Sequence, residues 1–484
     1  MTTPLILGTN SIKDEGYEVA NSLRFSGASS DYLERTFGAS GNTKTFTFSF
    51  WVKKCELATA PDTMTDAQML FGGQQSGYPA FQCLFLHTND TIFIKDAQAS
   101  NDIQLSIKTE MKFRDPSAWY HIVFAVDTTQ ATDSNRAKLY VNGVLQTALD
   151  GENSTGGASD NPLYPPQNTD LQFNGNEAHY INKYATNYED MYMAEFVFVD
   201  GQQLDATSFG EFDSDTNIWK PIDVSGLTFG TNGLYLDFEN SSSLGADVSG
   251  NGNNFTVNNL TSIDQTSDSC TNNFATMNPL AIPTSGGANT FSNGNLEITN
   301  SADAFRTSFS TIGVSSGKWY WEAKFLSGEM KQYIGISKPQ DTMDYLGQSA
   351  NSYSYQGENG RKNNNGSFTA GYGTAASTGD IIMVAFDADN GAIWVGKNGT
   401  WFSSATQAEI EAGTTTNAMY SSITIDDFFV VGATVEDSNI QFNFGSPMYS
   451  ISSGNSDGNG YGNFEYSVPS GYFALCSKNL SEYG

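Results

Sequence analysis

The sequence has 484 residues, with 53 acidic against 23 basic side chains, so its formal net charge is -30. Because this charge repels phosphate backbones and anionic bilayers, we expect no nucleic-acid partner and no insertion into a membrane. Aromatic residues make up 13% of the chain and 47 residues are glycine, which is typical of an all-β protein with large cores and many turns and argues against disorder.

Cysteine usage and the first residues bear on the compartment. The four cysteines form no Cys-x-x-Cys pair and are too few for a disulfide framework in a chain of this size, so we expect free thiols. They are Cys55, Cys83, Cys270 and Cys476. Residues 1–16 lack a basic segment followed by an apolar core, so we expect no secretory signal. No apolar run approaches the roughly 20 residues that span a bilayer.

The first half of the chain reads as a succession of strands. Residues 45–52 alternate strictly, with three phenylalanines on one face and hydroxyl side chains on the other. Residues 119–127 form an apolar strand, and residues 138–143 return towards an Asn-Gly turn. In residues 204–210, Asp205 is suited to cap a single helical turn. The pattern predicts a β-domain.

The second half repeats this pattern around residues 379–402. Residues 381–386 are apolar on both faces, so we expect a strand deep in a sheet that is covered on both sides. The segment 389–391 supplies the turn and residues 393–395 return as the next strand. No heptad pattern and no long amphipathic helix is present. A second β-domain is therefore expected.

These patterns predict an all-β chain with two antiparallel β-sandwich domains in tandem. We expect a short polar N-terminal arm at residues 1–16, which would be the attachment point, and a first sandwich at residues 17–240. Residues 241–290 are rich in Ser, Asn and Gly and read as a linker. The second sandwich, with a C-terminal extension, is expected at residues 291–484.

Both halves resemble known families. The first resembles the laminin-G/concanavalin A-like jelly roll, and the matching segments are 23–27, 48–52, 119–123 and 139–143. The second resembles a SPRY (B30.2-like) domain, and the matching segments are 317–322, 334–336, 379–382, 387–391 and 442–445. Both families are two-sheet β-sandwiches, so the resemblance implies the same jelly-roll architecture for both halves of this chain.

The combination of the two domains resembles virion proteins of marine tailed phages, notably cyanophages. The resemblance implies a non-enzymatic appendage on the particle surface, such as a tail fibre or knob, that binds a host cell-surface glycan or protein and contacts other virion proteins. Analogy with fibres suggests a homotrimer. Two alternatives stay open: a capsid or tail decoration protein with a structural role only, and a tail-associated polysaccharide depolymerase.

Ligand binding would use aromatic and amide side chains on loops between strands. Residues 345–365 are expected to form such a loop, with three asparagines at its end. Trp401 follows an Asn-Gly turn, where it would be partly exposed or would cap the core. The candidate ligand-binding residues are Tyr345, Tyr353, Tyr355, Arg361 and Trp401.

Catalysis by a glycosidase would need two carboxylates that face one cleft. Asp237 and Glu239 are two residues apart and would share one strand face with Tyr235, although alternation alone predicts such a solvated face. Glu195 lies inside an apolar strand, on the face of Met193 and Val197, without a second acid. We therefore assign no catalytic residue and expect no enzyme.

Other chemical motifs are weak. Cys83 and His87 share a strand face but lack the further ligand that a zinc site needs, and His121 reads as a packing residue rather than a general base. The Gly-x-Ser-x-Gly segments at 313–317 and 454–458 lack the strand-to-helix context of a nucleophile elbow, so turn formation explains them.

Calcium remains open, because two loops are rich in the oxygen ligands that it prefers. These are residues 247–253 and 457–460. An EF-hand count that starts at Asp457 places Val468 where a bidentate glutamate belongs, so that motif fails. Turn formation explains both loops without an ion. We therefore expect no cofactor, with calcium as the alternative.

Overall fold

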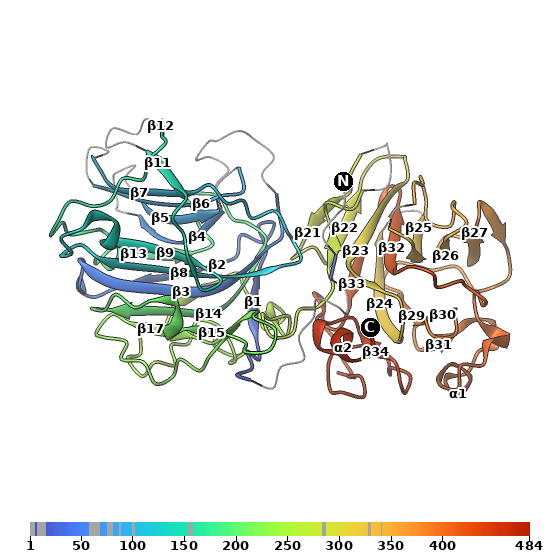
Figure 1. Cartoon of the computed structure of the whole chain (residues 1–484). Coiled ribbons are helices and arrows are strands. Elements are labelled where there is room, and N and C mark those ends of the chain that lie inside the picture. The colour runs from blue at the N-terminus through green and yellow to red at the C-terminus, as the bar shows by residue number, and fades with distance from the viewer. Residues whose placement is uncertain are drawn as a thin grey trace. The chain divides into compact units, whose positions relative to one another are not determined.

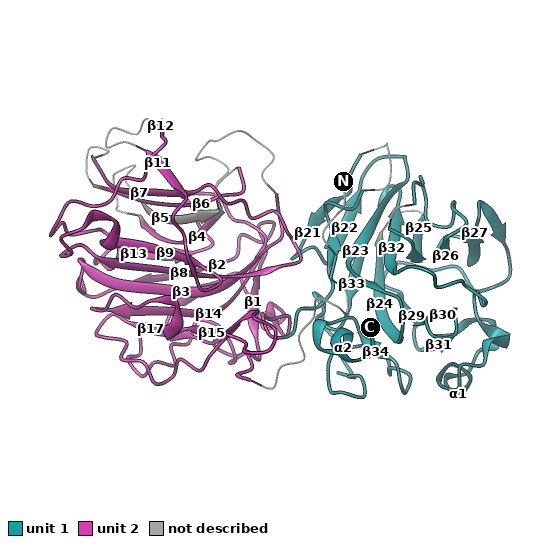
Figure 2. Ribbon diagram, in the orientation of Figure 1, with its two compact units in different colours: residues 1–14, 272–484 teal, residues 15–271 magenta. Residues whose placement is uncertain are grey.

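The computed structural model describes residues 5–6, 16–57, 68–74, 81–86, 89–98, 102–152, 158–282, 287–327, 331–339 and 341–484. The chain forms two compact units (Figure 2). The first unit comprises residues 15–271, and the second comprises residues 272–484 together with residues 1–14. Strands contain 41% of the residues and helices 6%, which confirms the prediction of an all-β fold.

One sheet of the first unit has eight strands in the order β10-β9-β8-β3-β14-β1-β19, with β17 paired to β14 (Figure 1). All of its pairs are antiparallel. Its strands are β1 (Ser22–Phe25), β3 (Thr45–Lys54), β8 (Trp119–Asp127), β9 (Ala137–Val141), β10 (Val144–Leu145), β14 (Met191–Asp200), β17 (Leu234–Leu236) and β19 (Gln265–Thr266).

The opposing sheet has nine strands in the order β12-β11-β7-β6-β5-β4-β13-β2-β18. Its strands are β2 (Tyr32–Thr36), β4 (Gln68–Gln74), β5 (Phe81–Leu86), β6 (Ile92–Gln98), β7 (Asp102–Thr109), β11 (Leu149–Glu152), β12 (Ala158–Ser159), β13 (Ala178–Ile181) and β18 (Thr256–Asn258). The two sheets form the expected antiparallel sandwich.

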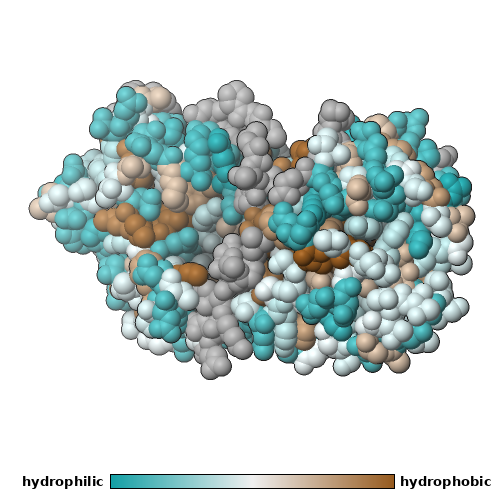
Figure 3. Space-filling model, turned by 45° about the vertical axis from the view of Figure 1, so that its right-hand side comes forward, coloured by the Kyte–Doolittle hydropathy of each residue, from teal (hydrophilic) through white to brown (hydrophobic). Residues whose placement is uncertain are grey.

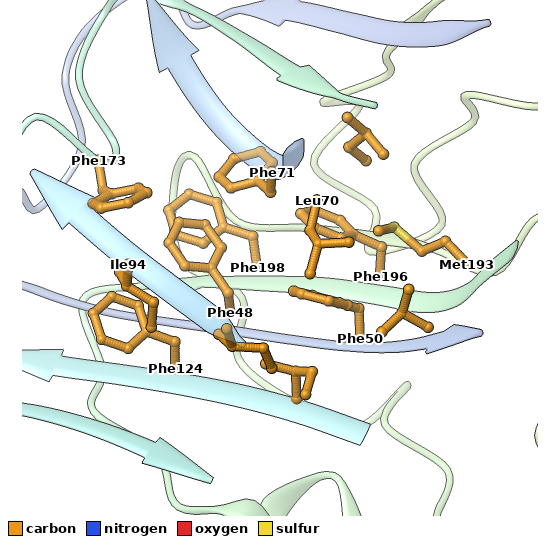
Figure 4. Packing of buried hydrophobic residues seen from close by; sticks show 14 of the residues in the cluster. Phe48, Phe50, Leu70, Phe71, Ile94, Phe124, Phe173, Met193, Phe196 and Phe198 are labelled. Carbon is orange, nitrogen blue, oxygen red and sulfur yellow. The ribbon is translucent and has the colours of Figure 1, made fainter. Parts of the chain in front are cut away.

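The core of the first unit lies between these sheets and is dominated by phenylalanine (Figure 4). Phe48 stacks on Phe198 with ring centroids 4.6 Å apart, and Phe50 stacks on Phe196 at 5.8 Å. Each fully buried ring contributes about 1.5–3 kcal/mol of transfer free energy. The phenylalanine face of β3 is therefore the core face, and the hydroxyl face, which includes Thr47 and Ser49, is buried as well.

A second apolar layer covers the outer face of the eight-stranded sheet. It includes the 3₁₀ turn η5 (Ala206–Ser208), whose N-cap Asp205 accepts a hydrogen bond from the Thr207 backbone N–H, as the sequence predicts. It also includes the hairpin of β15 (Gly210–Phe212) and β16 (Trp219–Pro221). Because the core covers the other side of the sheet, β14 is buried on both faces.

The second unit is also a sandwich of two sheets, in the orders β20-β23-β32-β25-β26-β27-β28 and β21-β22-β33-β24-β29-β30-β31, with β34 parallel to β24. The first sheet contains β20 (Met277–Asn278), β23 (Arg306–Val314), β25 (Gln332–Ser337), β26 (Ser352–Gln356), β27 (Arg361–Asn364), β28 (Ser367–Thr369) and β32 (Phe429–Val435). The second contains β21 (Thr290–Ser292), β22 (Glu297–Asn300), β24 (Lys318–Ser327), β29 (Ile381–Asp387), β30 (Ala392–Lys397), β31 (Thr400–Trp401), β33 (Ser438–Asn443) and β34 (Phe473–Ala474).

Strand β29 is buried along its whole length, as its two apolar faces predict. Ile382 and Val384 face the core between the sheets, whereas Met383 belongs to a cluster on the outer face that also contains Phe464 and other residues of the C-terminal extension. The short helices of this unit are α1 (Gln407–Glu411) and α2 (Ser477–Tyr483). None of the helices in the described ranges has the length and apolar character that spanning a bilayer requires.

The buried carboxylate of Glu322 holds this extension against the sheet. Its oxygens accept hydrogen bonds from the Tyr320 hydroxyl at 2.9 Å, the Asn443 amide at 3.3 Å, and the backbone N–H groups of Glu465 and Tyr466 at 3.0 and 2.8 Å. Burial raises the pKa of Glu322. Local patterns do not reveal this role, because the Asn443, Glu465 and Tyr466 donors lie more than a hundred residues from Glu322.

The structure departs from the expected linker and arm. Within residues 241–290, β18 pairs with β2 and β19 pairs with β1 in the first unit, and β20 pairs with β23 in the second. The boundary between the units falls after Thr271. The N-terminal arm also contributes a bridge, because Ile6 donates its backbone N–H to Thr311 of the second unit. Short polar segments complete sheet edges that local patterns do not reveal.

Candidate functional site

The outer face of the seven-stranded sheet in the second unit carries a cluster of aromatic side chains. On β25, Ile334 and Ile336 point into the core, so Tyr333 points to the opposite face. A direct row across three strands joins Tyr333 to Gln356 and then to Arg361, because these residues are cross-strand partners. The second row pairs Asn363 with Phe368.

Four rings form this aromatic face, which we define as Phe305, Tyr333, Tyr345 and Phe368. The Tyr345 ring lies 5.5 Å from Phe305, 5.6 Å from Tyr333 and 5.6 Å from Phe368, measured between centroids. Phe368 is 42% exposed, whereas Tyr333 is 2% exposed and forms the base of the cluster. The face is therefore anchored in the sheet and open to solvent at β28.

Polar groups border the aromatic face. The Gln356 amide donates to the Tyr333 hydroxyl at 3.1 Å and to Glu358 at 3.0 Å. Burial raises the pKa of Tyr333, and the charge of Arg361 opposes that rise. Across the described part of the chain, Arg361 makes no hydrogen bond or ion pair that would hold its guanidinium. A guanidinium in the same cluster as an exposed ring suits recognition of a ligand that offers both an acceptor group and an apolar face.

Two of the five candidate residues lie at this face and three do not. Tyr345 is one of its four rings, and Arg361 borders it in the same row as Tyr333. Tyr353 and Tyr355 point to the other side of β26, where Tyr353 packs on Tyr420 and Tyr355 stacks on Phe402. Residues 352–364 form the hairpin of β26 and β27 rather than a loop, so neighbouring side chains point to opposite faces.

Trp401 lies in a different part of the unit. It is 7% exposed and packs 6.5 Å from Tyr320 under the C-terminal extension. Of the two positions that the sequence allowed for Trp401, partly exposed or covering the core, the structure therefore has the second. Sequence reasoning missed Phe305, Tyr333 and Phe368, and the only available signal was the alternation around residues 333–336.

The carboxylates weighed for catalysis are close together but poorly placed for it. Asp237 and Glu239 follow β17 instead of lying on it, because Phe238 has a φ of 58° and turns the chain. Both raise the pKa of Glu195, so they lie within electrostatic reach of that residue. Glu195 itself is 6% exposed, which leaves it little access to a substrate.

The environment of Glu195 differs from the expected one. A bulge in β14 between Ala194 and Val197, with a φ of 50° at Glu195, separates this side chain from Met193. Its carboxylate accepts hydrogen bonds from the hydroxyls of Tyr235 at 2.6 Å and Tyr17 at 3.3 Å. Burial raises its pKa to about 7. The expectation that Glu195 shares a face with Met193 was therefore wrong.

His121 is a packing residue with both ring nitrogens engaged. Nδ1 accepts from the Trp219 indole N–H at 2.9 Å, which leaves Nε2–H to donate to the Ser49 hydroxyl at 2.9 Å. Burial lowers the pKa of His121 to about 3, so it is neutral at physiological pH. His87 and the Cys83 side chain lie outside the described residues.

The carboxylates of the two oxygen-rich loops accept hydrogen bonds from backbone N–H groups, both near each loop and in a neighbouring strand. Asp247 accepts from the N–H groups of Tyr235 and Asn253, and Asp457 accepts from those of Tyr461 and Ala474. Among the residues that the structure describes, no group of three His, Cys, Asp or Glu side chains could hold a metal ion. The observed geometry is that of hydrogen-bonded turns.

Comparison with family models identifies both halves. Residues 26–177 match the concanavalin A-like lectin/glucanases superfamily and residues 318–446 match the SPRY domain. The chain therefore carries a concanavalin A-like domain followed by a SPRY domain. No curated protein matches it. Most of the aromatic face lies inside the SPRY match, which includes Tyr333, Tyr345 and Phe368, and Phe305 precedes it.

Solved structures with similar folds are distant. The SPRY domain of human HERC1 is 14% identical, covering 34% of this chain and 96% of that one, with a TM-score of 0.28. The TRIM65 PSpry domain is 12% identical, covering 35% and 88%, with a TM-score of 0.25. A heptameric SAP-like pentraxin from Limulus polyphemus is 10% identical, covering 39% and 80%, with a TM-score of 0.25. These likenesses carry no argument about function.

Proposed function

We propose that this protein is a non-enzymatic binding protein that recognises a glycan or protein on a host cell surface through the aromatic face of its SPRY domain. We further propose that it acts as a tail-fibre or knob-like appendage on the surface of a phage particle, attached through other virion proteins. The aromatic face is the observation that carries the binding role, whereas the virion location depends on the resemblance of the domain combination.

Several features of the aromatic face support binding. Phe368 offers an exposed apolar ring at a sheet edge, and Tyr345 links it to the buried Tyr333, so the rings are held in fixed positions before a ligand arrives. Pre-positioned rings lower the entropy that binding must overcome. Arg361 and Glu358 add charged groups of both signs beside the rings, which would fix the orientation of a polar ligand.

Binding is favoured over the depolymerase alternative. Concanavalin A-like and SPRY domains are typically non-catalytic binding domains. Glu195 is the candidate carboxyl with a raised pKa, and its buried position beside two tyrosine hydroxyls suits a structural role better than contact with a polysaccharide. No observation favours a purely structural decoration protein over a receptor binder.

Binding by the full chain to a glycan array and to candidate host cells tests the role of the aromatic face. We expect Phe368→Ala and Arg361→Ala each to weaken binding about tenfold, because central aromatic and arginine residues carry most of the energy of an interface. Met111→Ala is the matched control, since Met111 is 39% exposed on the other domain. Equal binding by all these variants would contradict the proposal.

Immunogold labelling of intact particles tests the location. Label on the tail would support a role in host contact. Label spread over the head would favour the decoration protein, and absence of label would refute the virion assignment.

A further inference from the structure

Two lysines of the first unit are buried with their ammonium groups. The face of the protein shown in Figure 3 is mostly hydrophilic, and lysine side chains normally keep their charged ends in water. Among the described residues, the buried lysines are Lys53 and Lys54. Lys53 contacts Asp268 and Lys54 contacts Asp90, and both aspartates are buried as well. A buried ammonium group requires either a charged partner or a chemical change that removes its charge.

Lys54 connects the two sheets at one end of the core. It is the last residue of β3, and it follows Val52 on the core face of that strand. Asp90 lies two residues before β6, a strand of the opposing sheet. Because Lys54 Nζ contacts Asp90 Oδ1, the pair bridges the two sheets. Lys53 points to the other face, where its Nζ lies over the Tyr192 ring.

The carboxyl group of Asp90 is held in a fixed position. Asp90 has a φ of 66°, and its backbone carbonyl accepts a hydrogen bond from the Phe113 N–H at 2.6 Å. Its second side-chain oxygen, Oδ2, accepts from Arg114 Nε at 3.1 Å. The Arg114 side chain is 62% exposed and that of Asp90 is 6% exposed, so the guanidinium reaches the carboxyl group from the surface. The lysine nitrogen and the guanidinium therefore contact different oxygens of one carboxyl group.

The buried site favours an uncharged form of the pair. Burial lowers the pKa of Lys54 by more than the nearby carboxylates raise it, and these carboxylates belong to Asp90, Glu56 and Glu189. Transfer of a proton from Lys54 to Asp90 turns the ion pair into an amine and a carboxylic acid, which are easier to keep away from water. A neutral amine is a nucleophile, whereas an ammonium group is not.

We propose that Lys54 and Asp90 form an intramolecular amide bond that cross-links the two sheets. The Lys54 nitrogen attacks the carboxyl carbon of Asp90, and the bond from that carbon to Oδ1 breaks. Oδ1 leaves as water with two protons, one from the amine and one from the acid, while Oδ2 becomes the amide oxygen. Arg114 Nε–H donates to Oδ2, where negative charge develops during the attack, and so stabilises the transition state. The reaction requires no oxidant and no further reactant.

The position of the pair favours this condensation. Groups that are held in contact react as if at an effective concentration on the order of 10⁵–10⁸ M. Both side chains are buried, so water has little access for the reverse hydrolysis. Within the described ranges, Cys55, Cys270 and Cys476 are free thiols, and the amide would supply the covalent link that these cysteines do not. The inference does not depend on the proposed ligand site of the SPRY domain.

Mass spectrometry of the denatured full-length chain tests the proposal. We expect a mass about 18 Da below that of the sequence, because one water is lost. A tryptic digest should contain a branched peptide that joins the segments around Lys54 and Asp90. Lys54→Met and Asp90→Ala should each have the full mass of their sequences. Lys44→Met, at a more exposed ion pair, is the matched control and should keep the deficit.

A further variant tests the chemistry at a position where the fold should not suffer. Arg114 is largely exposed, and we expect Arg114→Ala to slow the appearance of the cross-link in newly folded chain at least about tenfold. An unmodified chain with the full mass of its sequence would overturn the proposal and leave the pair as a buried ion pair. A deficit that persists in Lys54→Met would place the lost water elsewhere, which would also overturn it. An unchanged rate in Arg114→Ala would overturn the role given to Arg114.

Discussion

Replacement of Glu195 by glutamine should make the stability of the first unit less dependent on pH. Glu195 is 6% exposed and accepts from two tyrosine hydroxyls, and Asp237 and Glu239 add negative charge nearby. Its pKa rises from 4.5 to about 7, which corresponds to about 3 kcal/mol of differential stabilisation of the protonated form.

The sign follows from the order of deprotonation. Because the folded-state pKa is the higher one, the unfolded chain loses this proton first as pH rises. The contribution of Glu195 to stability is therefore complete below pH 4.5, falls between pH 4.5 and about 7, and is absent above that range. Asp31 and Asp96, whose pKa values burial also raises to about 7, titrate in the same window and cancel when two variants are compared.

The measurement is unfolding of the full chain in urea, monitored by hydrogen exchange. Exchange in peptides from β3 and β14 reports on the first unit alone. The stability of the unmodified chain minus that of Glu195→Gln should fall by about 3 kcal/mol between acidic and alkaline conditions. A difference that stays constant with pH, or one that grows, would refute the reasoning. Glu110→Gln, at an exposed position of the same unit, is the matched control.

Three other perturbations follow from buried contacts. Lys53→Met should lower the free energy of unfolding by about 3–5 kcal/mol, because it removes the 2.7 Å ion pair with Asp268 and leaves that buried carboxylate without its partner. Lys44→Met, at the more exposed 3.8 Å pair with Asp170, should lower it by under about 1 kcal/mol. Denaturant unfolding measures both changes. Glu322→Gln should lower the free energy of unfolding by about 2–3 kcal/mol. It should also speed limited proteolysis after residue 446, and unchanged proteolysis would contradict the role of Glu322 in holding the C-terminal extension. Treatment with EDTA should leave the thermal midpoint unchanged, because Asp247 and Asp457 accept hydrogen bonds from backbone N–H groups; a midpoint that falls and is restored by calcium would contradict this.

The local pattern of the sequence determined much of the fold. Alternating phenylalanines gave the core face of β3, and the two apolar faces of residues 381–386 gave the fully buried β29. The Asn-Gly pair at residues 142–143 forms a tight turn with φ values of 45° and 79°. These features depend on side-chain period and on residues that tolerate positive φ, and both can be read from a few neighbouring residues.

Other features were decided by pairing between distant segments. Strand pairing brings Tyr333 of β25 and Phe368 of β28 to the same side of the sheet, and the candidate Tyr355 points away from that side because side chains alternate along β26. The bulge at Glu195 shifted one residue and redirected its side chain. Register and bulges are set by contacts across the sheet, so a linear pattern cannot fix them.

The sequence by itself determined the long core strands, the two-domain all-β class and the likeness to concanavalin A-like and SPRY domains. Only the tertiary structure decided which polar stretches complete the sheets, which carboxylates are buried, and which aromatic residues share a face. The physical reason is that strand patterns are local, whereas burial and hydrogen bonding of Glu322 or Asp268 depend on partners more than a hundred residues away. The aromatic face belongs to this second group.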